Sequence, residues 1–123
     1  MSAPETVSIE IFSDVMCPWC IIGYKQLQQA LTSLNGEIEA DIRWQPFELN
    51  PHMPEEGEDS AKHIARKYGR APDPEMRRQM EAIAAKAGYD MRYLGGQPEL
   101  EARLWNTFLA HKLLRWALEA HGP

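Results

Sequence analysis

The sequence has little cysteine, no long hydrophobic run and no excess of basic charge. Only two of its 123 residues are cysteine, which excludes the disulfide network that holds many small secreted domains together. No stretch approaches the roughly 20 apolar residues of a membrane-spanning helix, and residues 1–11 contain no signal-peptide core. With 13 basic against 18 acidic residues, the net charge of −5 argues against a protein that binds chiefly nucleic-acid phosphates.

What is present is the composition of one globular domain, with 44% hydrophobic and 25% charged residues. The absence of targeting and membrane segments predicts a cytoplasmic protein with no membrane or nucleic-acid partner. Both cysteines, Cys17 and Cys20, stand in one Cys-Pro-Trp-Cys segment. In a reducing compartment this spacing indicates redox chemistry or metal binding rather than a structural disulfide.

The first 45 residues predict a β-α-β unit. Apolar and polar residues alternate over 6–12, as in a strand with one covered face. From Cys17 the apolar residues recur every three or four positions, which predicts a helix that ends at the turn pair Asn35-Gly36. Alternation resumes over 38–44 and ends before Pro46. Because crossover connections are right-handed, the two strands are expected to be parallel and close together in one sheet.

After a turn-rich connector at residues 46–57, the pattern is helical and no third strand is visible. The expected helices are a short one capped by Asp59 or Ser60 and ending near Gly69, a second from Asp73-Pro74-Glu75 to Gly88, and a long last helix that opens at Pro98 after a Gly95-Gly96 hinge. There are no internal repeats and no Ser- or Gly-rich linkers.

The expected last helix is apolar on two sides. One stripe consists of Leu104, Phe108, His111, Leu114 and Leu118, and the other of Trp105, Leu109, Leu113 and Trp116. Such a helix requires partners on both sides, and a two-stranded sheet is marginal by itself. The sequence therefore predicts either the front part of a larger fold or a protomer that completes itself by association.

The Cys-Pro-Trp-Cys segment lies where the first strand has ended and the helix begins. Cys17 is expected at the N-cap, with Pro18, Trp19 and Cys20 as the first three helical residues. Free backbone amides and the positive end of the helix dipole would then stabilise a Cys17 thiolate and lower the pKa of that thiol. Cys20, one turn further on, can attack a mixed disulfide at Cys17. We assign Cys17 as the nucleophile and Cys20 as the resolving thiol.

The two cysteines allow two other interpretations. A structural bridge would close a loop of only four residues, worth at most roughly 2 kcal/mol in the chain-entropy model. Zinc requires four ligands, and the histidines (His52, His63, His111 and His121) offer no second close pair at ligand spacing, so no metal is expected. A Cys-x-x-Cys pair after a strand, at a helix start and inside a β-α-β unit favours a thioredoxin-like redox site.

Three groups of motifs carry a resemblance to a known family. They are Ser13-Asp14-Val15-Met16-Cys17-Pro18-Trp19-Cys20 with Ile22-Gly23; Pro46-Phe47-Glu48-Leu49-Asn50-Pro51 with Met53-Pro54 and Gly57; and Asn106-Thr107 with Ala110-His111 and Leu113-Leu114-Arg115-Trp116-Ala117. Together they resemble the DsbA-like thioredoxin oxidoreductases of the FrnE type. The resemblance runs through most of the chain.

The resemblance implies an α/β protein in which residues 1–50 are the N-terminal part of a thioredoxin-like domain and residues 51–123 a helical insertion subdomain. It also implies dithiol–disulfide exchange with protein or small-molecule thiols and no bound cofactor. Relatives of this architecture, 2-hydroxychromene-2-carboxylate isomerase and kappa-class glutathione transferase, bind glutathione and typically carry serine at the position of Cys17. The family's C-terminal strands and cis-proline loop have no counterpart here, so we expect an N-terminal fragment.

Three hypotheses of function follow. The first is a thiol–disulfide oxidoreductase. The second is a glutathione-dependent isomerase or transferase with glutathione as co-substrate. The third is a non-catalytic module that oligomerises through its last helix.

Further residues are assigned to the site beside the two cysteines. In the active-site loop, Asp14 is either a loop cap or a functional acid, and Trp19 is expected at an exposed rim where it touches substrate. Phe47, Asn106 and His111 are expected as further substrate contacts, although Asn106 could instead bond a loop and His111 could instead be a core residue. The basic residues of the second half (Lys62, Arg66, Lys67, Arg70, Arg77 and Arg78) are interpreted as solvated helix faces.

Overall fold

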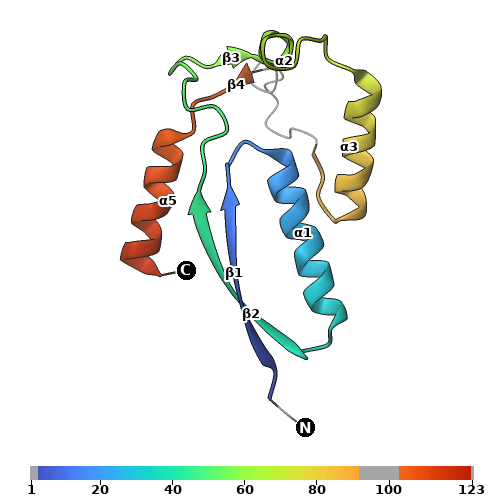
Figure 1. The fold of residues 1–123 in the computed structure, drawn as a ribbon, viewed down its shortest axis with the longest axis vertical. Helices are drawn as coiled ribbons and strands as arrows, with labels where there is room; N and C mark the ends of the chain where they lie inside the picture. The colour runs from blue at the N-terminus through green and yellow to red at the C-terminus, as the bar shows by residue number, and fades with distance from the viewer. Residues whose placement is uncertain (1–2, 92–102, 123) are drawn as a thin grey trace. The chain divides into compact units, whose positions relative to one another are not determined.

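The structure, a computed structural model, describes residues 3–91 and 103–122 (Figure 1). In chain order the elements are β1 (Glu5–Ser13), α1 (Pro18–Ser33), β2 (Ile38–Pro46), β3 (Glu58–Asp59), α2 (Ser60–Tyr68), α3 (Pro74–Lys86), β4 (Arg103–Leu104) and α5 (Phe108–His121). The described residues form two compact units. The first comprises 3–47 and 81–91, and the second comprises 48–80 and 103–122.

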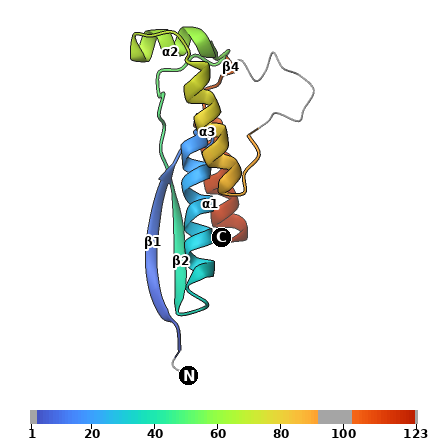
Figure 2. The ribbon, with the colours of Figure 1, turned by 90° about the vertical axis from the view of Figure 1, so that its right-hand side faces the viewer.

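The first unit contains the β-α-β arrangement that the sequence predicts. β1 and β2 pair in parallel, from Glu5 opposite Ile38 to Ser13 opposite Pro46. α1 runs beside this sheet in both ribbon views (Figures 1 and 2), and Tyr24 on α1 meets Trp44 on β2 edge to face at 4.8 Å. The alternating apolar residues of both strands share the face that carries Trp44, because side chains of a strand alternate between faces. The predicted parallel pair is therefore confirmed.

The ends of α1 follow from local chemistry. Pro18 occupies the first helical turn, where its missing N–H removes no helical hydrogen bond. At the other end, Asn35 (φ 48°) and Gly36 (φ 79°) adopt left-handed backbone conformations that these two residue types tolerate best. The turn brings the carbonyl of Glu37 to the amide of Glu5 at 2.9 Å, which sets the register of the two strands.

The second half of α3 belongs to the first unit. Ala84 and Ala87 are buried, and Gln29 on α1 donates a hydrogen bond to the carbonyl of Lys86 at 3.2 Å. The division expected at residue 50 places all of α3 in the helical part. The compact units group residues 81–91 with residues 3–47, where the small side chains of Ala84 and Ala87 permit close packing, and the expected division into two domains stays a prediction.

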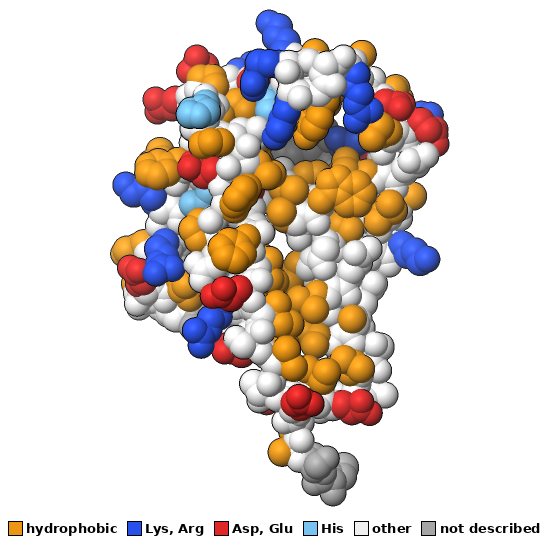
Figure 3. Space-filling model, viewed as in Figure 1, with side chains coloured by type: hydrophobic (Ala, Val, Ile, Leu, Met, Phe, Trp, Pro, Cys, Tyr) orange, Lys and Arg blue, Asp and Glu red, His pale blue; other side chains and the backbone are white. Residues whose placement is uncertain are grey.

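The second unit is built around a short strand pair and α2. β3 and β4 are antiparallel, with Glu58 opposite Leu104 and Asp59 opposite Arg103. The Asp59 carboxylate accepts a hydrogen bond from the Lys62 amide at 3.0 Å and thereby caps α2. Of the two caps that the sequence predicted, Asp59 or Ser60, the structure uses Asp59. The helix ends at Gly69 in the left-handed conformation. Lys and Arg side chains gather over α2 at the surface (Figure 3).

Two predictions about the C-terminal part are wrong over the described residues. Arg103 and Leu104 form the strand β4, so the last helix does not include them. β3 and β4 also show that strands follow β2, where the sequence predicted none. α5 begins only at Phe108, because the Asn106 side chain accepts a hydrogen bond from the Phe108 amide at 2.9 Å and starts the helix there. The expected hinge and the expected helix start at Pro98 lie outside the described residues.

A close backbone approach joins the two short strands. Gly57 has a φ of +78°, and a Cβ atom on it would overlap the carbonyl oxygen of Leu104 and lie 3.1 Å from the Trp105 ring. Only glycine fits this combination of left-handed backbone and absent space. None of the helices in the described ranges combines the length and apolar character that crossing a bilayer requires.

Candidate dithiol site

The loop between β1 and α1 positions the first cysteine. β1 ends at Ser13, and the Asp14 carbonyl accepts a hydrogen bond from the Cys17 amide at 3.1 Å, which closes a tight turn. Cys17 has an extended backbone (φ −88°, ψ 112°) and is the N-cap of α1, as predicted. The Cys20 amide then donates to the Cys17 carbonyl at 3.2 Å. Both cysteines are free, half-buried thiols at one helix end.

The pKa of Cys17 differs from the sequence expectation. Burial of the thiol is the main cause that raises its pKa above the usual value, and a hydrogen bond with the Cys20 thiol raises it further. The Cys17 side chain makes no hydrogen bond that caps α1. The backbone amides of Cys20 and Trp19 nevertheless act to lower the pKa of the Cys17 thiol. The predicted amide effect is therefore present, but burial outweighs it. The expectation of a lowered pKa is wrong.

Exposed apolar side chains surround this loop within the first unit. Trp19, between the cysteines, is 52% exposed. Phe47 is also half exposed, and its amide donates to the Ser13 carbonyl at 3.1 Å, which places its backbone beside the end of β1. Phe12 at the end of β1 and Val15 in the loop itself add two more exposed apolar groups. Substrate contact by Trp19 and Phe47 stays a prediction.

Asp14 is almost completely buried, with 1% of its surface exposed. A buried carboxyl requires hydrogen-bond partners, and Asp14 has interactions within the structure. Its backbone carbonyl also holds the Cys17 amide. These observations fit a residue that orders the active-site loop, one of the two roles that the sequence allowed.

Asn106 and His111 lie in the second unit, and the structure shows how each is held. The Asn106 side-chain amide donates to the Met53 carbonyl at 2.7 Å, while its oxygen accepts from the start of α5. His111 is buried in the first turn of α5 and has interactions of its own. Asn106 thus links the loop at Met53 to the start of α5 within the second unit. The predicted contact of both residues with substrate stays a prediction.

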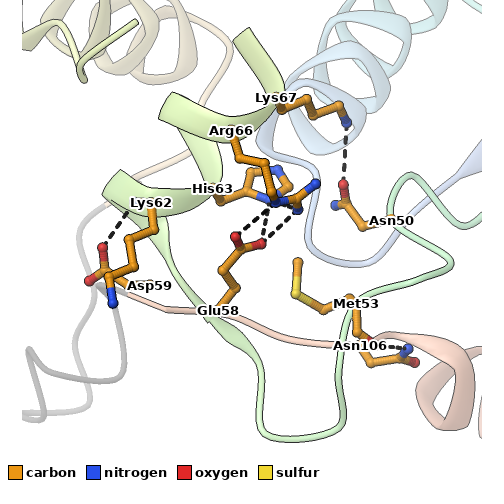
Figure 4. Close-up of polar contacts among 9 residues, drawn as sticks. All are labelled: Asn50, Met53, Glu58, Asp59, Lys62, His63, Arg66, Lys67 and Asn106. Atoms are coloured by element: carbon orange, nitrogen blue, oxygen red, sulfur yellow. Dashed lines mark hydrogen bonds and ion pairs between the residues drawn. The ribbon is translucent and has the colours of Figure 1, made fainter. Parts of the chain in front are cut away.

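A polar cluster that sequence reasoning missed holds α2 to β3 (Figure 4). Glu58, at the start of β3, receives two hydrogen bonds from Arg66, at 3.0 and 2.8 Å. The Nδ1 atom of the buried His63 lies 3.1 Å from the same carboxylate. We call Glu58, His63 and Arg66 the α2 cluster. Its sequence signal is an acid just before a helix whose fourth and seventh residues are His and Arg.

The charges of the α2 cluster act on one another. Hydrogen bonds from Arg66 and then from His63 lower the pKa of the Glu58 carboxyl to about 2. The same carboxylate raises the pKa of Arg66. Glu58 therefore stays ionised throughout the ordinary pH range, and the cluster is a permanent ionic clamp on α2. Among the described residues, no group of three or more His, Cys, Asp or Glu side chains could hold a metal ion.

The fold and the dithiol together define the class. A free Cys-x-x-Cys pair at the amino end of the helix that follows the first strand of a parallel β-α-β unit marks a thioredoxin-like protein. The chain belongs to the family of DSBA-like thioredoxin domains, whose profile matches residues 8–122.

The chain is also similar to two individual proteins. Over 91% of its length the chain is similar to the crystal structure of a probable DsbA oxidoreductase from Streptomyces coelicolor, with a TM-score of 0.72 and 26% sequence identity. A stretch of 46 residues is 39% identical to the uncharacterized protein YwbO of Bacillus subtilis (strain 168). The chain spans 47% of the Streptomyces protein and this stretch spans 21% of YwbO, so both relatives are longer.

Proposed function

We propose that this chain carries the reactive dithiol of a cytoplasmic thiol–disulfide oxidoreductase of the FrnE type. The observation that supports it most directly is the pair of free thiols at the start of α1, close enough to share a hydrogen bond. The dithiol itself carries the electrons, so no bound cofactor is needed. The substrates would be thiols and disulfides of proteins or small molecules.

In the reducing direction, the Cys17 thiolate attacks one sulfur of a substrate disulfide. A Cys17–substrate disulfide forms, and the other substrate sulfur leaves as a thiolate that takes up a proton. Cys20 then loses its proton and attacks Cys17 Sγ, which releases the second substrate sulfur. The dithiol becomes a Cys17–Cys20 disulfide, and two electrons have passed to the substrate. The reverse sequence oxidises a substrate dithiol.

The raised pKa of Cys17 also favours a second candidate function, that of a glutathione-dependent isomerase or transferase. A thiol that stays protonated can donate a hydrogen bond to the thiolate of bound glutathione without forming a disulfide. In that function glutathione is a co-substrate, and Cys20 has no chemical step to perform.

Replacement of Cys20 by serine separates the two candidates. For an exchanger, Cys20→Ser should accumulate a mixed disulfide between Cys17 and a disulfide-containing peptide, detected as an added mass by intact-protein mass spectrometry. Cys17→Ser is the matched control and should trap none, because the remaining thiol is the resolving one. No adduct on Cys20→Ser, together with undiminished turnover of a glutathione conjugate by that variant, would contradict the exchange function.

A further inference from the structure

The most exposed apolar surface of the second unit lies on α5. Leu109, Leu113, Trp116 and Ala120 share one side of the helix, at spacings of four, three and four residues. We call these four residues the outer ridge. Leu109 is 68%, Leu113 62% and Trp116 58% exposed, and hydrophobic side chains reach the surface over α5 (Figure 3). Three large apolar side chains in one row are unusual for a surface that faces water alone.

The outer ridge is not the face that attaches α5 to its own molecule. The N-cap Thr107 and His111 are buried, and Ala110 and Ala117 are partly covered. At 100° per residue these positions lie on the other sides of the helix, away from the row that begins at Leu109. α5 is therefore held by one face and offers a second one outward.

Apolar residues at alternating spacings of four and three are typical of two helices that pack side by side, with these residues at their interface. The positions that flank the row on its polar side are Lys112 and Glu119, and Glu119 also accepts a hydrogen bond from Arg115 of its own helix at 2.9 Å. In an antiparallel pair of two α5 helices, Leu113 meets the partner's Trp116, and Leu109 meets the partner's Ala120. The twofold symmetry then brings Lys112 beside the partner's Glu119 and repeats this opposite-charge contact at the other end.

A parallel pair lacks this complementarity. It would set Lys112 beside the partner's Ala117 and give Glu119 no oppositely charged residue of the partner helix, since parallel helices pair the two different flanks of the row. The ridge, the small flanking alanines and the two opposite charges thus favour one occupant and one orientation. We propose that α5 is a self-association surface, on which a second copy of this chain docks through its own α5 in antiparallel orientation.

The size of the surface sets the expected strength. α5 has 14 residues and is therefore about 21 Å long. A contact of that length lies at or below the lower end of specific protein interfaces, about 1,200 Å² in total. We expect a weak, concentration-dependent dimer rather than an obligate one.

Sedimentation equilibrium of the 123-residue chain over a wide concentration range tests the proposal. Lys112→Glu places like charges at both symmetric contacts and should weaken dimerisation roughly tenfold. The double variant Lys112→Glu with Glu119→Lys exchanges the two charges and should restore most of the affinity. Because Lys112 and Glu119 are exposed, circular dichroism should show an unchanged fold.

Lys62→Glu is the matched control, since it makes the same charge change on an exposed residue of α2 and should leave the dimer unaffected. Three outcomes would overturn the proposal. They are a monomer at every concentration, a dimer that Lys112→Glu leaves unchanged, and a double variant no stronger than Lys112→Glu. The cysteines play no part in this contact, so the result is independent of the proposed redox function.

Discussion

The Cys17 thiol is subject to two opposing influences that operate over different distances. The amides of the first helical turn are set by the local sequence, because a Cys-Pro-Trp-Cys segment at a helix start places them there. Burial is set by every segment that covers the sulfur, wherever it stands in the chain. The second influence dominates, and the pKa of Cys17 rises. Fewer thiolates are therefore present at neutral pH than a helix start alone would give.

Removal of the neighbouring thiol should lower this pKa. Cys20 raises the pKa of Cys17 through its side-chain hydrogen bond and through its charge, whereas its lowering effect comes from the backbone amide, which Cys20→Ala keeps. In Cys20→Ala, the alkylation of Cys17 by iodoacetamide should thus increase at lower pH than in the parent chain. The rates can be followed by mass spectrometry of the Cys17 peptide. An unchanged or higher pKa in Cys20→Ala would contradict this account.

Among elements, α2 depends most on one side chain. Glu58 binds both Arg66 and His63, so Glu58→Gln removes the charge that holds the α2 cluster together. The folded-state pKa of about 2 lies below that of an unfolded glutamate. The stabilisation is consequently complete above the unfolded pKa and is lost as the pH falls through about 2.

We therefore expect Glu58→Gln to lower the thermal unfolding midpoint at pH 7. The variant should also lose less stability than the parent chain between pH 5 and pH 2. Glu75→Gln is the matched control, because Glu75 also binds an arginine but in an ion pair that is exposed on both sides. Equal pH dependence of Glu58→Gln and the parent chain, measured by circular dichroism, would rule out the clamp.

The contact between β3 and β4 depends on the missing side chain of Gly57. Gly57→Ala forces a left-handed backbone on alanine and pushes its Cβ into the Leu104 carbonyl. We expect a loss of about 1–3 kcal/mol in the free energy of unfolding, measured by urea denaturation. Gly69→Ala has a similar φ of +67° with nothing within 4 Å, so it should cost less. Equal costs would show that the Leu104 contact is unimportant.

On the scale of the whole molecule, the described chain covers few of its large apolar side chains. Among the described residues, Ile22 and Met53 are the large apolar residues that are buried, whereas Phe12, Trp19, Phe47 and most apolar residues of α5 remain exposed. The parallel sheet has two strands within the described residues. That the fold needs additional contacts stays a prediction. The proposed α5 pairing would supply one of them.

Much of the fold was accessible from the sequence because the signals are local. Alternation predicted β1 and β2, and proline and glycine marked the helix ends. The short strands β3 and β4 could not be predicted, since two residues show no period and their pairing joins segments more than 40 residues apart. The late start of α5 was missed for the same reason. Asn106 reaches back to Met53, and this distant contact fixes where the helix begins.

The sequence by itself determined the β-α-β unit, the placement of Cys17 at a helix start and the spacing of the two thiols. Each of these follows from backbone preferences of neighbouring residues. Only the tertiary structure decided the direction of the Cys17 pKa, the ionic clamp on α2 and the outward face of α5. The burial and the contacts of a side chain depend on segments that are distant in the chain, and no local sequence pattern shows which of these segments meet.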